Sequence, residues 1–139
     1  MGARVVLGVI GDDIHVVANR ILNIGLENAG FSTCNLGPHN MAQDFVDAAM
    51  EVEADAVLVS SLNGEAEHWC GNFRQRFVAV GRGDILLYAG GNLVVGDRPE
   101  AQVEALFEDY GFDRVFYRQT DFDEVMNLLA QDLSDGNSK

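Results

Sequence analysis

An aspartate and a histidine lie two residues apart near the amino terminus, in the segment Asp13-Ile14-His15. An imidazole can give one ring nitrogen to a metal ion while a carboxylate accepts a hydrogen bond from the N–H of the other nitrogen. That second bond fixes the tautomer of the ring and raises its basicity as a ligand. The pair therefore predicts metal chemistry with His15 as the ligand. A histidine taken alone is more often a surface residue, so the prediction depends on its surroundings.

The segments on either side of this pair indicate a strand followed by a helix. Residues 5–10 are apolar throughout, which is typical of a strand buried on both faces of a parallel sheet. Residues 21–26 have apolar positions at helical spacing. Open α/β sheets bind ligands at the carboxyl ends of their strands. We therefore expect Asp13 and His15 at a ligand-binding edge.

Two more loops are predicted to reach the same edge, because they follow the apolar runs 56–60 and 85–89. Serine hydroxyls can donate and accept hydrogen bonds, and adjacent glycines let backbone approach a ligand closely. Each loop taken alone could simply end a strand. Together with the histidine they favour a site for a large, partly apolar ligand. The loops are Ser60-Ser61-Leu62-Asn63-Gly64 and Gly90-Gly91-Asn92-Leu93-Val94.

The whole chain alternates strand-like and helix-like segments, which predicts a doubly wound α/β fold. With five strands we expect the flavodoxin-like (Rossmann-like) parallel sheet in the order 2-1-3-4-5. One domain spans residues 1–134, and residues 135–139 form a loose tail. The remaining strands are predicted at 31–35 and 114–116, and the remaining helices at 41–53, at 65–77, from Pro99, and after a cap at Thr120 or Asp121.

The charge balance is strongly acidic, with 22 acidic against nine basic residues and a formal net charge of −13. Such a surface repels nucleic acid and anionic membranes. The only lysine is the terminal Lys139, and the acids are scattered along the helices. In molar salt the Debye length is about 3 Å, so this self-repulsion is screened. We therefore favour a halophilic protein over an ordinary acidic one. Without a membrane-length apolar run or a secretory signal, we expect it to be cytoplasmic.

Other chemistries are less well supported. No Gly-x-Gly-x-x-Gly follows the first strand, and no Walker lysine is present. Asp12 and Asp13 resemble the acidic pair of a response-regulator receiver. The receiver's phosphorylatable aspartate and its lysine, however, are replaced by Ser60 and Arg118-Gln119. We expect loop or packing roles for the two other histidines and both cysteines, namely His39, His68, Cys34 and Cys70.

With these residues in view, the chain resembles the small, cobalamin-binding subunits of glutamate mutase (methylaspartate mutase) from about Val5 to Leu133. The Asp-x-His motif, a later Ser-x-Leu and a Gly-Gly are typical of modules that bind cobalamin with its base displaced from cobalt. The Gly-Gly-Asn continuation at residues 90–92 favours glutamate mutase over the acyl-CoA mutases. Further matching segments lie at 54–56, 59–62, 90–96 and 111–115.

The resemblance implies an isomerase that interconverts L-glutamate and L-threo-3-methylaspartate with adenosylcobalamin as its cofactor. His15 would be the lower axial cobalt ligand, held by Asp13. We expect no catalytic side chains on this chain, because the cofactor supplies the radical. L-glutamate would bind a larger barrel-type subunit, in a heterotetramer with this one. The expected cofactor-binding residues are Asp12, Asp13, Ile14, His15, Val16, Ala18, Ser60, Ser61, Leu62, Gly90, Gly91, Asn92, Leu93 and Val94.

One residue departs from the family's pattern, because Ala18 stands where the motif has a glycine. In the family that glycine lets the nucleotide tail of cobalamin pass beside the first helix, so we expect the added methyl group to tighten or shift the pocket. A corrinoid carrier for methyl transfer and a receiver-like signalling module are the alternative functions. Such carriers usually bear a helical bundle ahead of the cobalamin module, whereas the first strand here begins at Arg4.

Overall fold

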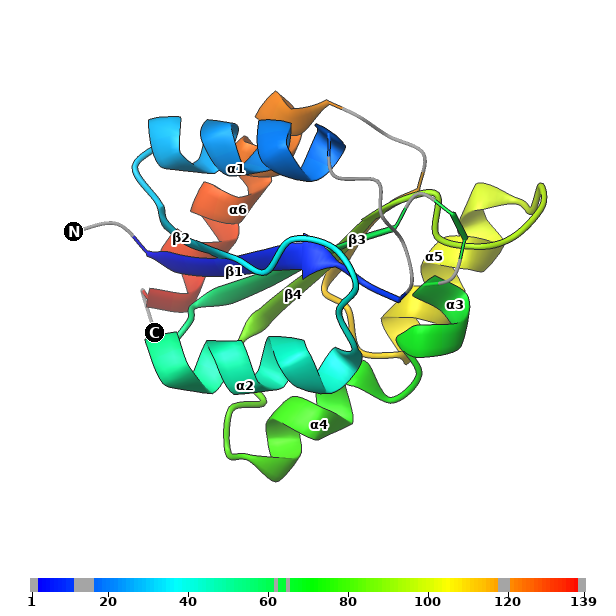
Figure 1. Cartoon of the computed structure of the whole chain (residues 1–139), viewed down its shortest axis with the longest axis horizontal. Helices are drawn as coiled ribbons and strands as arrows, with labels where there is room; N and C mark the ends of the chain where they lie inside the picture. The colour runs from blue at the N-terminus through cyan, green and yellow to red at the C-terminus, as the bar shows by residue number, and fades with distance from the viewer. Residues whose placement is uncertain (1–2, 12–16, 62, 65, 118–120, 138–139) are drawn as a thin grey trace.

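The computed structural model describes residues 3–11, 17–61, 63–64, 66–117 and 121–137, with side chains up to Ser134. Within these residues five parallel strands form one sheet in the order β2-β1-β3-β4-β5 (Figure 1). This order confirms the prediction. Their carboxyl ends lie together at the right of Figure 1. The strands are β1 (Arg4–Val9), β2 (Ser32–Asn35), β3 (Ala56–Ser61), β4 (Leu86–Gly91) and β5 (Arg114–Tyr117).

Helices cover both faces of the sheet. Helices α1 (Val17–Asn28) and α6 (Phe122–Asn137) lie side by side on one face (Figure 1). The other face carries α2 (Ala42–Val52), α3 (Ala66–Trp69), α4 (Phe73–Ala79) and α5 (Glu100–Asp109).

The sheet separates two apolar cores. Under α1 and α6 the core contains Leu22 and Leu26 of α1 and Leu129 of α6, packed on strand residues such as Leu58 and Tyr88. Under the other four helices the core is larger and rich in phenylalanine, with Phe45, Phe73, Phe77 and Phe107 all fully buried. Two-sided burial explains why the central strands read as continuous apolar runs in the sequence.

Two helices differ in extent from the sequence-based prediction. The helix predicted over 65–77 is divided into α3 and α4, because Asn72 adopts a left-handed conformation with φ of 58°. The last helix reaches Asn137, and so enters the segment predicted as a loose tail. At its start the Asp121 carboxylate accepts a hydrogen bond from the Glu124 N–H at 3.2 Å, which confirms Asp121 as a cap.

Candidate functional site

The loops that follow β3 and β4 lie next to each other at the carboxyl edge of the sheet, as the sequence predicts. Ser60 pairs with Gly90, and Ser61 pairs with Gly91. The Gly64 N–H donates to the Asn92 carbonyl at 3.0 Å, which joins the two loops. Gly64 has φ of +82°, and a Cβ there would lie 2.8 Å from the backbone of Val94, so only glycine fits this approach.

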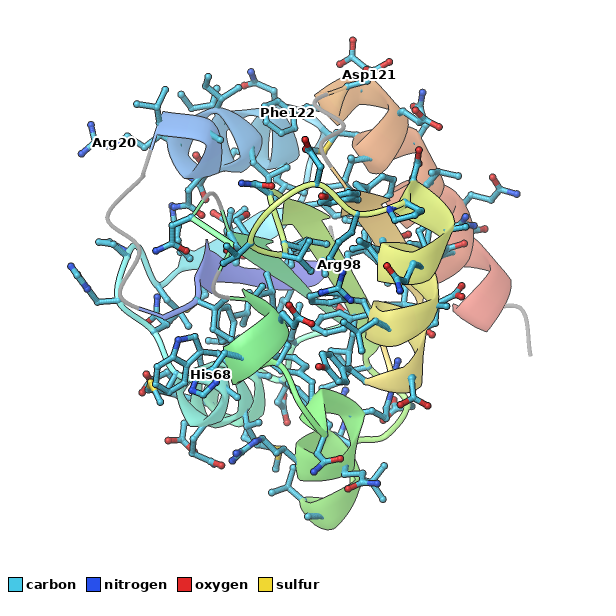
Figure 2. All side chains as sticks on the ribbon, turned by 90° about the vertical axis from the view of Figure 1, so that its right-hand side faces the viewer. Arg20, His68, Arg98, Asp121 and Phe122 are labelled. Atoms are coloured by element: carbon cyan, nitrogen blue, oxygen red, sulfur yellow. The ribbon has the colours of Figure 1, made fainter. Side chains whose placement is uncertain are left out.

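A small cavity opens at this edge between α1, α6 and the ends of the central strands. Its volume is about 80 Å³, and most of its wall is apolar. Figure 2 looks onto the carboxyl edge and shows Phe122 of α6 beside α1. The residues that line the cavity are Ala18, Asn19, Leu22, Leu58, Val59, Ser60, Tyr88, Ala89, Gly90, Gly91, Phe116, Phe122 and Val125.

Gly90 leaves space in the cavity that the protein does not need for its own packing. A Cβ on Gly90 would lie 3.7 Å from Cβ of Phe116, which is an ordinary van der Waals contact. Gly90 is also not among the glycines with positive φ. Neither a clash nor a left-handed backbone therefore requires glycine in this strand. The missing side chain keeps room for a ligand, which is one recognised use of glycine in a strand.

Asn19 of α1 is the polar residue buried in the cavity wall, with 2% of its surface exposed. Its Nδ2 donates to Oδ1 of Asn35 at 2.7 Å. Its Oδ1 is buried and has no hydrogen-bond partner among the described residues. The apolar wall with one buried carbonyl oxygen suits a flat apolar group that carries a hydrogen-bond donor.

The predicted site residues fall into three groups in the structure. Ala18, Ser60, Gly90 and Gly91 line the cavity. Ser61, Leu93 and Val94 are fully buried, and the latter two belong to the core under α2 to α5, so their side chains pack away from the cavity. Asn92 contributes its carbonyl to the contact between the loops. The predictions for Asp12, Asp13, Ile14, His15, Val16 and Leu62 lie outside the described residues.

Asn40, which the sequence reasoning did not single out, fixes the point where the chain leaves β1. Its side chain is 8% exposed, and Nδ2 donates to the carbonyls of Gly37 at 2.7 Å and Val9 at 3.2 Å. Its own carbonyl accepts a hydrogen bond from the N–H of Gly11 at 2.6 Å. Gly11 is the last described residue before the segment 12–16, so Asn40 fixes the chain at the point where the segment with Asp13 and His15 begins.

The sequence reasoning also missed the far wall of the cavity, formed by Phe116 of β5 and by Phe122 and Val125 of α6. The signal was present in two forms. Phe116 pairs with Gly90 across β4 and β5, and Phe122 and Val125 are three residues apart on one helix face. Only the strand order, however, shows that β5 and α6 reach the ligand-binding edge beside α1.

The other candidate metal ligands are dispersed. His39 is exposed in the loop after β2, and His68 is exposed on α3, where its ring stacks edge-on against Trp69. Cys70 is fully buried, and burial raises the pKa of its thiol, so it stays a neutral packing residue. Among the described residues no group of three His, Cys, Asp or Glu side chains could hold a metal ion.

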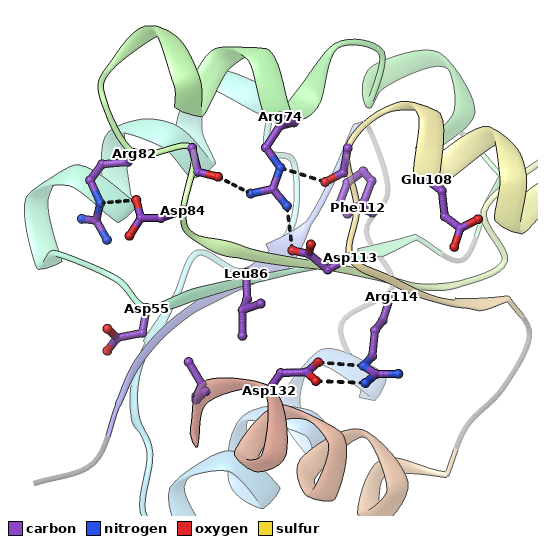
Figure 3. A pocket seen from close by; sticks show the side chains of 13 residues that line it. Asp55, Arg74, Arg82, Asp84, Leu86, Glu108, Phe112, Asp113, Arg114 and Asp132 are labelled. Carbon is purple, nitrogen blue, oxygen red and sulfur yellow. Dashed lines mark hydrogen bonds and ion pairs between the residues drawn. The ribbon is translucent and has the colours of Figure 1, made fainter. Parts of the chain in front are cut away.

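A second, larger pocket of about 890 Å³ lies at the opposite, amino-terminal edge of the sheet (Figure 3). Its charged groups bind one another. Arg74 donates to the carbonyls of Gly83, Ile85 and Gly111 and to the Asp113 carboxylate. Arg82 pairs with Asp84 in the same pocket.

Arg114 and Asp132 form a third ion pair in this pocket, with two hydrogen bonds at 2.7 and 2.9 Å (Figure 3). The Arg114 guanidinium holds the pKa of the Asp132 carboxyl below its usual range. Tyr88 donates its hydroxyl to the same carboxylate, and burial together with Asp132 raises the pKa of Tyr88. These bonds attach α6 to β4 and β5. We therefore infer that the charged groups of this pocket stabilise the fold.

Comparison with protein families and curated proteins gives one consistent result. Residues 3–125 match the model of the B12 binding domain. A glutamate mutase sigma subunit of Carboxydothermus hydrogenoformans is 48% identical over 94% of this chain and 95% of its own length. Glutamate mutase sigma subunit 2 of the halophile Haloarcula marismortui is 46% identical over 93% and 86%. One from Escherichia coli O157:H7 is 45% identical over 95% and 89%.

Solved structures share the fold at lower identity. A cobalamin-binding protein from Desulfitobacterium hafniense superposes with a TM-score of 0.74 at 22% identity, over 93% of this chain and 58% of that one. The receiver domain of a response regulator from Mycobacterium tuberculosis reaches 0.66 at 12% identity, over 96% and 97%. Such likenesses establish the fold alone. In the described part of the chain, none of the helices has the length and apolar character needed to cross a membrane.

Proposed function

Because this chain belongs to the family of glutamate mutase sigma subunits and consists largely of a B12 binding domain, we propose that it is the adenosylcobalamin-binding subunit of a glutamate mutase. In this proposal the active enzyme interconverts L-glutamate and L-threo-3-methylaspartate. When bound, the cofactor supplies radical chemistry through cleavage of its cobalt–carbon bond. The present chain binds and orients the cofactor.

The observation that carries this proposal is the cavity at the carboxyl edge. Its apolar wall, the space left by Gly90 and the buried oxygen of Asn19 match the chemistry of the nucleotide tail of a cobalamin whose base has left the cobalt, and its about 80 Å³ would take part of that tail. Ala18, Ser60 and Gly91 would contact the tail from α1, β3 and β4. The cavity lies directly beside the helix that begins after the segment 12–16.

His15 would then be the lower axial ligand, in place of the displaced base. A histidine that ligates a metal normally donates its other N–H to a carboxylate or carbonyl, and Asp13 would accept that bond. The Asn40 bonds to Val9, Gly37 and Gly11 support this role, because they hold the base of the loop against the sheet.

The substrate would bind a larger, barrel-type subunit in a heterotetramer. Two carboxylates need cationic partners, and the described carboxyl edge offers few. Arg98, near the centre of that edge in Figure 2, already pairs with Glu67 at 2.6 Å. A subunit that covers the edge would enclose the cofactor between the two chains and exclude water from it.

The experiment that tests this proposal compares His15→Ala with His68→Ala in cobalamin binding. His68 is exposed on α3, away from the lining of the cavity, so it serves as the matched control. We expect the His15 variant to bind cobalamin at least about 10–100-fold more weakly, and the absorption spectrum to lack imidazole coordination. A variant spectrum that still shows coordination by a protein imidazole would refute the assignment of His15.

A further inference from the structure

Asn19, a residue that lines the cavity, has a buried side-chain carbonyl oxygen that nothing in the described protein satisfies. The residue is 2% exposed. Its Oδ1 is shielded from solvent and lacks a hydrogen-bond partner among the described residues. Native structures pair the large majority of buried side-chain polar atoms, so an unpaired one requires an explanation.

The orientation of this amide is fixed by its neighbours. The N–H of Gly37 donates to Oδ1 of Asn35 at 3.0 Å, so the atom of Asn35 at that place must be an acceptor. The Asn19 atom that faces the same oxygen at 2.7 Å must therefore be its nitrogen. This leaves the oxygen of Asn19 as the amide atom turned away from Asn35, at the wall of the cavity that Asn19 lines.

The other polar groups of the lining do not donate a hydrogen bond to this oxygen. The Tyr88 hydroxyl donates to the Asp132 carboxylate, and the Ser60 hydroxyl is not bonded to the Asn19 oxygen either. Leu22, Leu58 and Phe116, also in the lining, have no polar side-chain atoms. Any partner for this oxygen must come from outside the described protein, and it must be an O–H or N–H donor.

We propose that Oδ1 of Asn19 accepts a hydrogen bond from an O–H or N–H donor on the nucleotide tail of the corrinoid and thereby positions the tail in the cavity. The inference rests on the proposed function. Two groups on such a tail offer this chemistry: a ribose hydroxyl, or the exocyclic amine of an adenine base. Asn19 is in either case a positioning residue that discriminates corrinoids with a nucleotide from those without one.

The test measures the dissociation constants of three corrinoids for wild type and Asn19→Leu, a variant of similar size without the acceptor. The probes are cobalamin, an analogue with adenine as the lower base, and cobinamide, which lacks the nucleotide. Loss of one neutral hydrogen bond predicts about 5–10-fold weaker binding of nucleotide-bearing corrinoids and unchanged binding of cobinamide. Asn23→Leu is the control, because Asn23 lies on the same helix outside the cavity lining.

The pattern across the probes identifies the donor. Equal loss for cobalamin and the adenine analogue assigns the ribose hydroxyl, and loss for the analogue alone assigns the exocyclic amine. Equal loss for all three, cobinamide included, overturns the inference in favour of a structural role. Wild-type protein that binds none of the three overturns the proposed function, and this inference with it.

A second variant covers the case in which Asn19→Leu does not fold. Asn35→Ala removes the partner that orients the Asn19 amide but keeps the Asn19 oxygen, and Asn35 is exposed, so the fold should persist. We expect a smaller loss, about 2–5-fold, again confined to corrinoids with a nucleotide. Unchanged binding of all three probes by a folded Asn35→Ala protein would overturn the proposal, as would unchanged binding of all three by a folded Asn19→Leu protein.

Discussion

The two ends of the sheet carry hollows of opposite character. The amino-terminal pocket is the larger, at about 890 Å³ against about 80 Å³, and holds three arginines. Its arginines are bonded to carboxylates and carbonyls of the same chain. The small carboxyl-edge cavity is instead lined by Asn19, whose side-chain oxygen has no hydrogen-bond partner among the described residues, and by Gly90, a glycine that the fold does not require. We therefore propose the small carboxyl-edge cavity, and not the larger pocket, as the binding site.

We expect the amino-terminal pocket to contribute to stability and the carboxyl-edge cavity to contribute to cofactor binding. Bonds at the amino edge, such as those of Arg74, join α4 to the strands and their removal should weaken the fold. Substitutions in the lining of the cavity between α1 and α6 should change the free energy of unfolding little but should weaken cobalamin binding. Substitutions in each region can therefore break or sharpen the contrast.

The largest effect is expected from Ala18→Leu. Ala18 lines the cavity from α1, and a leucine side chain would fill much of its about 80 Å³. Cobalamin binding should be abolished while the melting temperature stays near that of the wild type. Titration of the variant with cobalamin, followed by absorption, checks this, with Ala105→Leu on the exposed face of α5 as the control. Native affinity in Ala18→Leu would show that the tail does not pass this residue.

Arg74→Met should produce the opposite result. It removes four hydrogen bonds, including 3.0 Å to Gly111 and 2.6 Å to Asp113, and leaves partly buried carbonyls without donors. The free energy of unfolding should fall by about 2–3 kcal/mol, since each lost partner exposes a desolvation cost. Denaturant unfolding measures the loss, and cobalamin affinity should stay unchanged in the folded variant.

The control for that substitution is Arg76→Met on the same helix. Arg76 is exposed and has one long bond of 3.4 Å to Gln43, so its removal should change stability by less than about 0.5 kcal/mol. If Arg74→Met weakened cobalamin binding as strongly as a cavity substitution, the amino edge would belong to the site and the contrast would fail.

A smaller effect is expected from Ala18→Gly, which restores the glycine of the family motif. Removal of the methyl group enlarges the cavity, and relief of about 1 kcal/mol of crowding corresponds to about 5-fold tighter binding. Glycine should also lower the stability of the free protein by about 0.5–1 kcal/mol, because it weakens α1. Isothermal titration and thermal unfolding measure the two effects. Weaker binding by a stably folded Ala18→Gly would mean that the alanine contributes a contact.

The fold could be predicted from the sequence because its strands are unambiguous. Runs such as 5–10 and 56–60 are apolar on both faces, and five βα units leave few topologies. The division of the helix at 65–77 was missed although Gly71-Asn72 signals it, because glycine and asparagine are the residues that most readily end a helix, and Asn72 does so with a left-handed backbone.

Part of the cavity wall could also be expected from the sequence, because strand order brings Ser60 and Gly90 together, while Ala18 was expected only from the resemblance to a family. Leu93 and Val94 resembled lining residues, yet their side chains belong to the opposite core, and register decides this. Asn19 and Asn40 gave no signal, because an asparagine becomes informative only when its burial and partners are known.

The central claim is that His15 coordinates cobalt while the nucleotide tail occupies the cavity between α1 and α6. Electron paramagnetic resonance of the complex with cob(II)alamin tests it most directly, in protein whose histidines carry nitrogen-15. Coordination by His15 predicts that the axial nitrogen splits each cobalt line into a doublet, and that His15→Ala loses the doublet. A triplet from nitrogen-14, which only the cofactor's own base can supply, would contradict the account.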